Sequence, residues 1–264
     1  MSIDIDILGV GVAAPGLPDW PAFKAVLAGG AIDPEARPAA SQLLSPRERR
    51  RAPAAVKLSF AAAEEACAMA GLVPAEPVAV FSSGMGDLDI TDYMCRTLVE
   101  SPELLSPTRF HNSVHNAASG YWSIGAGATG DVTAMSGWRD SAVAGLIEAM
   151  GRIACDPEPV LVVIYDDVAK GPMTDLWPSQ HPFGCALVLA PAGHERTLLR
   201  LRADRIDQAG PDISLPASLI ERIHDNPAAR VLPLLALIAA DTDAGRADLS
   251  AEQGPGLRFE TLSR

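Results

Sequence analysis

The sequence predicts an α/β domain in which helices cover both faces of a mixed sheet. Short apolar runs alternate along the chain with longer Ala-rich or amphipathic segments, as strands alternate with helices. The run at 157–165, PEPVLVVIY, is almost continuously apolar, which is typical of a strand buried on both faces. Further along, Leu199 and Leu201 alternate with Arg200 and Arg202, which predicts a strand with one solvated face.

The composition is that of a folded, acidic protein. Of the 264 residues, 48% are hydrophobic and 20% are charged, which is typical of a globular chain long enough for one or two domains. The formal net charge of −12 argues against nucleic acid or an anionic membrane surface as a partner. The longest apolar segment, 231–240, contains Pro233 and is too short to cross a bilayer. We therefore expect no membrane span.

The four cysteines predict neither a disulfide framework nor a zinc site. Cys67, Cys95, Cys155 and Cys185 show no Cys-x-x-Cys spacing, and the first residues carry no signal-peptide pattern. A reducing, cytoplasmic location follows as the default. We expect these thiols to be small buried hydrophobes.

The N-terminal segment predicts a half-buried strand, because isoleucine and aspartate alternate over residues 3–7. Residues 9–14 then show the spacing Gly-x-Gly-x-x-Ala, which imitates a dinucleotide-binding fingerprint. That fingerprint needs a helix that begins inside the motif, and the prolines within 15–18 prevent one here. We expect no nucleotide site and place the first helix between residues 18 and 30.

The next segments predict two helices around a short strand. The Ala-rich segment 53–70 is expected to be a buried helix with Gly71 as its C-cap. A strand over 77–82 and a helix over 87–100 follow. The basic cluster 47–51, RERRR, has two interpretations. It could contact an anion, either the phosphopantetheine of a carrier or an acidic partner face, or it could be the solvated start of a helix, which we favour.

The segment 107–150 is the most informative part of the chain. It predicts a polar loop, a short helix carrying Tyr121 and Trp122, a Gly-rich link, a strand and a long helix. The junction of strand and helix, 133–137, predicts a sharp turn at a helix N-terminus. Enzymes place nucleophiles at such elbows, because the backbone amides lower a thiol pKa and stabilise an oxyanion. Here the position holds Met135, whose thioether has no proton to lose and cannot form a thioester.

Neighbouring residues offer alternative chemistry. Ser136 lies on the same turn, but a nucleophilic serine would need a histidine base and an oxyanion hole, and the turn is not a Gly-x-Ser-x-Gly elbow. We favour Ser136 as the N-cap of the long helix, with Asp140 in its early turns. His111 and His115 are four residues apart, but the helical zinc motif needs a glutamate where Asn112 stands. We expect no metal.

The strand at 157–165 ends in Asp166 and Asp167. Paired carboxylates can bind magnesium, but at a strand end they are more often solvated, and we expect these to face water. The remaining predicted elements are a buried strand over 183–190, helices over 216–224 and 228–240, and a closing strand over 257–262 that pairs with 198–202.

Five segments of the chain occur in the same order in one known family. Three carry most of the similarity, HNSVHNAASGYWSI (111–124), TAMSGWRDSAVAGL (133–146) and HPFGCALVLA (181–190), and two support it, LGVGVAAPG (8–16) and KLSFAAAEEACAMAGL (57–72). On these segments the chain resembles the N-terminal half of a β-ketoacyl synthase, a thiolase-fold condensing enzyme. It is most similar there to the short ketosynthase-like chain length factors of aryl polyene-type pathways, within type II polyketide and fatty acid biosynthesis.

The resemblance implies half of a thiolase-like fold, with a ketosynthase-like domain over 1–190 and a C-terminal extension over 191–264 packed on it. It implies that Met135 stands where a catalytic ketosynthase has its cysteine nucleophile. The two histidines of decarboxylative condensation come from the second half of that fold, and this sequence ends before that half. No cofactor is implied. The strand 131–134 would pair with its counterpart at the dimer interface, since an exposed edge needs a partner.

The leading hypothesis from this resemblance is a catalytically silent partner of a true ketosynthase. In the heterodimer, the ketosynthase would supply the cysteine and both histidines. It would also receive the acyl carrier protein, which this chain would meet only indirectly. This chain would shape the acyl or polyene tunnel. The residues expected at the tunnel wall or the interface are Phe110, His115, Asn116, Ala134, Met135, Ser136 and Trp138.

Two alternatives stay open at this point. One is an acyltransferase or hydrolase that uses Ser136 as its nucleophile. The other is a homodimeric scaffold with no acyl tunnel. Covalent trapping of Ser136 by an acyl or fluorophosphonate probe would favour the first, and a stable homodimer that ignores any ketosynthase would favour the second.

Overall fold

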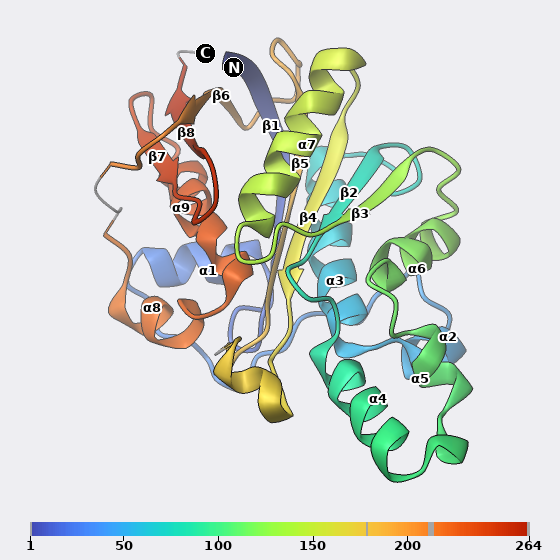
Figure 1. Cartoon of the computed structure of the whole chain (residues 1–264). Helices are drawn as coiled ribbons and strands as arrows, with labels where there is room; N and C mark the ends of the chain where they lie inside the picture. Colours follow the sequence, from blue (N-terminus) through green and yellow to red (C-terminus); the bar gives the residue numbers. More distant parts are fainter. Residues whose placement is uncertain (1, 178, 211–213, 263–264) are drawn as a thin grey trace.

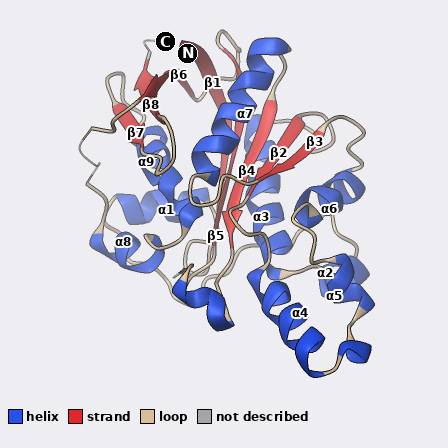
Figure 2. Ribbon diagram, viewed as in Figure 1, coloured by secondary structure: helices blue, strands red, loops and turns tan. Residues whose placement is uncertain are grey.

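In a computed structural model, the chain forms one eight-stranded mixed sheet with helices on both faces (Figures 1 and 2). The structure describes residues 2–177, 179–210 and 214–262. The strand order is β3-β2-β4-β5-β1-β6-β8-β7. The strands are β1 (Ser2–Ala13), β2 (Val78–Ser82), β3 (Val132–Met135), β4 (Val160–Asp166), β5 (Phe183–Pro191), β6 (Leu199–Ile206), β7 (Arg246–Leu249) and β8 (Gly256–Thr261).

The helices confirm the predicted alternation with strands. They are α1 (Trp20–Leu27), α2 (Pro46–Arg51), α3 (Ala54–Ala70), α4 (Leu88–Glu100), α5 (Pro107–His111), α6 (Ala117–Ala126), α7 (Ser141–Cys155), α8 (Ala217–Ile223) and α9 (Leu232–Ala240). Short 3₁₀ helices are η1 (Pro102–Leu104), η2 (Gly171–Asp175) and η3 (Pro227–Val231).

The predicted helix ends are confirmed where the sequence carries a capping residue. Asp19 precedes α1 and its side chain accepts a hydrogen bond from the backbone N–H of Ala22. Gly71 ends α3 in the left-handed region, with φ of 69°. Asp87 caps α4 through the N–H of Ile90. Local chemistry alone therefore determines these boundaries.

The sheet has a parallel part and an antiparallel part. β3, β2 and β4 run parallel, whereas β5 is antiparallel to both β4 and β1, and β6, β8 and β7 continue antiparallel. The predicted pairing of the closing strand β8 with β6 is confirmed. As a result, the carboxyl ends of β3, β2 and β4 lie side by side at one end of the sheet.

Two apolar cores lie on opposite faces of the sheet. In β4 every residue is buried, as the apolar run predicts, and alternate side chains point to opposite faces. Val162 packs in the core shared with α1, α7 and α9, and Val163 packs in the core shared with α3 and α6. The helices in front of and behind the sheet in Figure 1 are thus held by the same central strands.

The glycines of the fingerprint-like segment serve helix packing. A Cβ on Gly9 would lie 2.1 Å from the carbonyl oxygen of Ala66, and one on Gly11 would lie 2.0 Å from that of Ala62. Both positions therefore need glycine so that α3 can lie against β1. This close approach accounts for the Gly-x-Gly spacing without a nucleotide.

The C-terminal quarter continues the same sheet. The predicted boundary at residue 190 falls near the end of β5, and β6, β8 and β7 then extend the sheet beyond β1. Figure 1 shows α8 and α9 on the same side of the molecule as these strands. No helix among the described residues is long and apolar enough to cross a membrane.

Two predictions about burial are wrong. Asp166 and Asp167 are 1% and 6% exposed, so they do not face water as expected at a strand end. Of the four free cysteines, Cys67 and Cys185 are buried as predicted, whereas Cys95 and Cys155 are exposed. Cys95 lies on the exposed helix α4 and Cys155 ends α7, so these two positions lie outside the cores.

Candidate functional site

The candidate site lies where the three parallel strands end. Met135 is the last residue of β3 and lies opposite Ser82, the last residue of β2. Asp166 is the last residue of the next strand, β4. In open α/β sheets, ligands bind outside the carboxyl ends of the strands. Met135 is half-buried and packs against the core beneath α7.

The turn after Met135 differs from the predicted elbow. The helix α7 begins at Ser141, so five residues, 136–140, separate it from β3. The prediction that Ser136 is its N-cap is wrong, because Asp140 occupies the N-cap position. Trp138 has a positive φ of 57°, a strained conformation for a residue with a side chain.

Side-chain hydrogen bonds explain why the helix starts late. The hydroxyl of Ser141 accepts a hydrogen bond from the N–H of Gly137 (3.0 Å) and donates one to the carbonyl oxygen of Trp138 (2.7 Å). These two bonds satisfy backbone groups that a longer α7 would otherwise pair. The turn is therefore a defined structure and not a frayed helix end.

Ser136, the alternative nucleophile, is held by backbone groups. Its hydroxyl donates to the carbonyl oxygen of Gly84 (2.9 Å) and accepts from the N–H of Trp138 (3.2 Å). In this arrangement the hydroxyl proton points to a carbonyl oxygen, which does not activate a nucleophile as a histidine base does.

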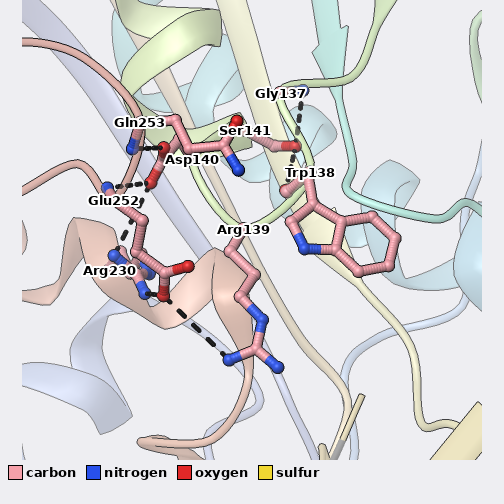
Figure 3. A network of polar contacts seen from close by, with 8 residues as sticks. All are labelled: Gly137, Trp138, Arg139, Asp140, Ser141, Arg230, Glu252 and Gln253. Carbon is pink, nitrogen blue, oxygen red and sulfur yellow. Dashed lines mark hydrogen bonds and ion pairs between the residues drawn. The ribbon is translucent and has the colours of Figure 1, made fainter. Parts of the chain in front are cut away.

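Residues from the C-terminal quarter hold the same turn (Figure 3). The carboxylate of Asp140 accepts hydrogen bonds of 2.8 Å from the backbone N–H groups of both Glu252 and Gln253. Arg230 lies 3.6 Å from that carboxylate and also pairs with Glu252. Arg139 donates to the carbonyl oxygen of Leu176 (2.8 Å), the residue before Trp177.

Two tryptophans cover the carboxyl end of β2. The rings of Trp138 and Trp177 lie edge to face with centroids 5.0 Å apart. Trp177 is 1% exposed and Trp138 is 39% exposed. A Cβ on Gly84 would lie 2.2 Å from the ring of Trp177 and 2.9 Å from the carbonyl oxygen of Trp138, so only glycine fits beneath them.

The two histidines that are four residues apart do not share a hydrogen-bond partner. His115 places Nε2 2.9 Å from the carbonyl oxygen of Ser83, whereas Nδ1 of His111 lies 3.2 Å from Oδ1 of Asn112. Asn112 is buried, donates to the carbonyl oxygen of Arg51 and accepts from the hydroxyl of Tyr121. In the part of the chain that the structure describes, no group of three or more His, Cys, Asp or Glu could hold a metal ion.

Asp166 is a feature of the site that the sequence did not reveal. Its Oδ1 accepts hydrogen bonds of 2.8 Å from the hydroxyl of Ser83 and from the N–H of Gly84, while Oδ2 is buried without a hydrogen-bond partner. Burial raises the pKa of Asp166 to about 7, against the effect of these bonds. Asn226 from the C-terminal quarter donates to the carbonyl oxygen of Asp166 at 2.9 Å.

The other expected wall residues lie on the surface of the segment from α5 to α6, of which α6 contacts β3. Phe110 on α5 is 59% exposed, and Asn116 lines a pocket of about 520 Å³ with Tyr121 and Ile124. Among the described strands, β3 pairs only with β2, so its other edge, which includes Ala134, is open. Figure 1 shows α5 and α6 on the same side of the molecule as β3.

Comparison with known proteins gives one family. The family model described as "Beta-ketoacyl synthase, N-terminal domain" matches residues 20–226. Among curated proteins, a search by sequence finds no match.

Three solved structures resemble the chain over nearly its full length. One is a ketosynthase (ApeO) in complex with its chain length factor (ApeC) from Xenorhabdus doucetiae, with a TM-score of 0.73, 22% identity, and coverage of 98% of this chain and 99% of that chain. The ishigamide ketosynthase/chain length factor gives a TM-score of 0.75, 14% identity, and coverage of 98% and 99%. AntDE:AntF, a type II polyketide synthase acyl-carrier protein in complex with its ketosynthase, gives a TM-score of 0.74, 15% identity, and coverage of 100% of both chains. At these identities the likeness shows a shared fold, the thiolase-like half predicted from the sequence.

Proposed function

Because the chain belongs to the family of β-ketoacyl synthase N-terminal domains, we propose that it is a non-catalytic chain length factor. In this role it pairs with a catalytic ketosynthase and shapes the tunnel that receives the growing acyl or polyene chain. The observation that carries the proposal is Met135 at the carboxyl end of β3, the position at which the family resemblance implies a cysteine nucleophile.

The chemistry of Met135 makes this chain the silent member of the pair. A thioether sulfur has no proton to lose, so it forms no thiolate and no acyl thioester. The partner ketosynthase therefore carries the acyl group on its own cysteine and receives the acyl carrier protein. Among the solved relatives, one is a ketosynthase in complex with its chain length factor and another includes an acyl-carrier protein, which supports this choice of partners.

The open edge of β3 supports pairing with another subunit. An unpaired edge strand presents free N–H and C=O groups to solvent, and folded proteins usually cover such an edge. Exposed apolar side chains lie on the neighbouring α5–α6 region, at 59% exposure for Phe110, 52% for Val114 and 75% for Ile124. Apolar surface of this kind beside an open edge suits a subunit interface.

The tunnel acts by steric exclusion. Met135 and Trp138 lie at the carboxyl ends of the parallel strands, and Phe110, His115 and Asn116 lie on the segment that leads into α6. In the complex, these side chains form or support the wall that an extending chain meets. We place the complex in the cytoplasm, where the four free cysteines of this chain stay reduced.

Co-expression with a ketosynthase encoded nearby tests the proposal. We expect the two chains to elute together in size-exclusion chromatography, and a radiolabelled acyl thioester to label only the partner's cysteine. The matched control is the partner with that cysteine changed to alanine, which should leave the complex intact and unlabelled. The proposal fails if the purified chain condenses acyl units alone, if Ser136 is acylated, or if the chain forms a homodimer that excludes the ketosynthase.

A further inference from the structure

We propose that Asp140 is a positioning residue that holds Trp138 at the tunnel wall, through contacts with residues 230 and 252–253. We call these contacts the C-terminal clamp. The clamp gives the C-terminal quarter a specific task. The inference rests on the proposed function, because it concerns the geometry of that wall.

The conformation of Trp138 needs support from outside the turn. A left-handed backbone is strained for a residue with a Cβ, so it persists only where the surroundings fix it. The described residues contain only two non-glycine residues with positive φ, Trp138 and Asp241. Within the turn, Trp138 is bound through its N–H to Ser136 and through its carbonyl oxygen to Ser141. The N–H of Asp140 also donates to the carbonyl oxygen of Gly137 (3.0 Å), so backbone bonds run along the whole turn, and the side chain of Asp140 makes contacts outside it.

The clamp joins the side chain of Asp140 to the C-terminal quarter. Both carboxylate oxygens of Asp140 are used, one by the N–H of Glu252 and the other by the N–H of Gln253, each at 2.8 Å. A carboxylate that accepts two backbone N–H groups suits this geometry, because both groups are donors and the anion only accepts. The side chain of Asp140 is 13% exposed, so solvent weakens these bonds little.

Arginines on either side extend the clamp. Arg230 at η3 lies 3.6 Å from the Asp140 carboxylate and pairs with Glu252, and Arg139 lies 4.0 Å from Glu252. Figure 3 shows the two arginines and the segment at 252–253 around the turn, with the indole of Trp138 pointing away from them. Arg139 also donates to the residue preceding Trp177, the aromatic partner of Trp138.

Asp140 thus acts on the indole through the backbone. It touches no part of the expected acyl path itself, whereas Trp138 is partly exposed at the carboxyl edge of the sheet, three residues after Met135. Loss of the clamp frees the turn to relax from the left-handed conformation. The indole then leaves the ring of Trp177, and the wall yields to a longer chain.

The test uses Asp140→Asn, which keeps the shape of the side chain. Its amide NH2 group replaces one carboxylate oxygen, so one of the two backbone N–H groups loses its acceptor and faces a donor. The second variant is Gln253→Pro, which removes one donor and leaves the sequence of the turn intact. The matched control is Glu148→Gln, which removes an ion pair to Arg152 on the same helix, at 2.8 Å, away from the turn. All three are measured as the full chain and in complex with the ketosynthase.

In the full chain we expect Asp140→Asn and Gln253→Pro to raise the rate of tryptic cleavage after Arg139 at least tenfold and to weaken the near-ultraviolet circular dichroism of the Trp138–Trp177 pair. Glu148→Gln should change neither. In the complex we expect both variants to shift products to longer or broader lengths, with acylation of the partner unchanged. Asp140→Glu, which keeps the carboxylate, should recover part of both effects.

The inference is overturned if the cleavage rate and the tryptophan signal of both variants match those of the native chain. It is also overturned if the turn loosens but the product lengths stay the same. These results differ from failure of the proposed function, in which the native chain itself does not bind the ketosynthase or does not alter its products.

Discussion

The hydroxyl of Ser83 donates a hydrogen bond of 2.8 Å to Oδ1 of Asp166, and it thereby joins the carboxyl ends of β2 and β4 through a buried carboxyl group. The other oxygen of Asp166 has no hydrogen-bond partner among the described residues. Burial raises the pKa of this group from 3.8 to about 7. The site therefore contains an acid that takes up a proton close to neutral pH.

The stability of the protein should depend on this proton. The folded state holds it up to a pH of about 7, whereas the unfolded chain releases it near 3.8. Unfolding therefore releases a proton between these values, so the free energy of unfolding decreases as the pH rises from 4 to 7 and levels off above 7. Asp166→Asn should flatten this dependence and stabilise the protein at pH 8 by up to about 4 kcal/mol.

Urea denaturation from pH 5 to pH 8 measures this effect. A shallower slope should remain in the variant, because burial also raises the pKa of Asp167 to about 6. Asp243→Asn, at an exposed position, is the matched control and should follow the native profile. If Asp166→Asn keeps the native slope, Asp166 does not titrate as described.

The Gly9 and Gly11 positions predict large losses of stability on substitution. A methyl group at either position would lie about 2 Å from a backbone oxygen of α3, which cannot move without displacing the helix from β1. Gly9→Ala and Gly11→Ala should each reduce the free energy of unfolding by roughly 3 kcal/mol or more. Gly151→Ala on α7 is the control, because nothing lies within 4 Å of its Cβ.

Chemical denaturation distinguishes these variants by their free energies of unfolding. The dependence of that free energy on denaturant concentration (the m-value) should be the same in all of them. Gly151→Ala should stabilise the protein by about 0.5–1 kcal/mol, since alanine favours a helix interior. A stable Gly9→Ala protein would mean that α3 does not pack against β1 as closely as the structure has it.

A substitution at the open edge of β3 should separate the folding of this chain from its association with the ketosynthase. The N–H groups of Ala79 and Ser83 bond to the carbonyl oxygens of Asp131 and Met135, so the odd-numbered residues of β3 face β2. The backbone of Ala134 then faces the open edge. Ala134→Pro removes an outward N–H, which an edge strand tolerates.

We expect Ala134→Pro to weaken binding to the ketosynthase at least tenfold, or about 1.4 kcal/mol, with a melting temperature close to that of the native chain. Binding is measured by titration of the purified partner. Ala39→Pro, in the exposed loop after Pro38, is the control. Native affinity in a folded Ala134→Pro protein would argue against β3 as the interface.

The proposed tunnel wall predicts a change in product length when its residues are shortened. Met135→Ala and Phe110→Ala should lengthen or broaden the products of the complex, because a shorter side chain lets the acyl chain extend further. Acylation of the partner's cysteine should stay unchanged. Mass spectrometry of the products measures the distribution, and Met135→Leu, which keeps the side-chain volume, is the control. An unaltered distribution in an intact complex would remove these residues from the wall.

Several elements of the fold could be predicted because their cause is local. Gly71 ends α3 since glycine accepts the left-handed conformation, and the apolar run of β4 requires burial on both faces. The start of α7 could not be predicted in this way. Ser136 has the chemistry of an N-cap, but Ser141 bonds to the turn before it and moves the N-cap four residues along the chain, to Asp140.

The sequence by itself determined the alternation of strands and helices and the caps of α1, α3 and α4, because each depends on residues close together in the chain. Only the tertiary structure decided which distant groups meet. It buried Asp166 beneath the loop after β2, and it brought Glu252 and Gln253 to the carboxylate of Asp140. Contacts across more than 80 residues depend on how the sheet is ordered, and no local pattern of residues carries that order.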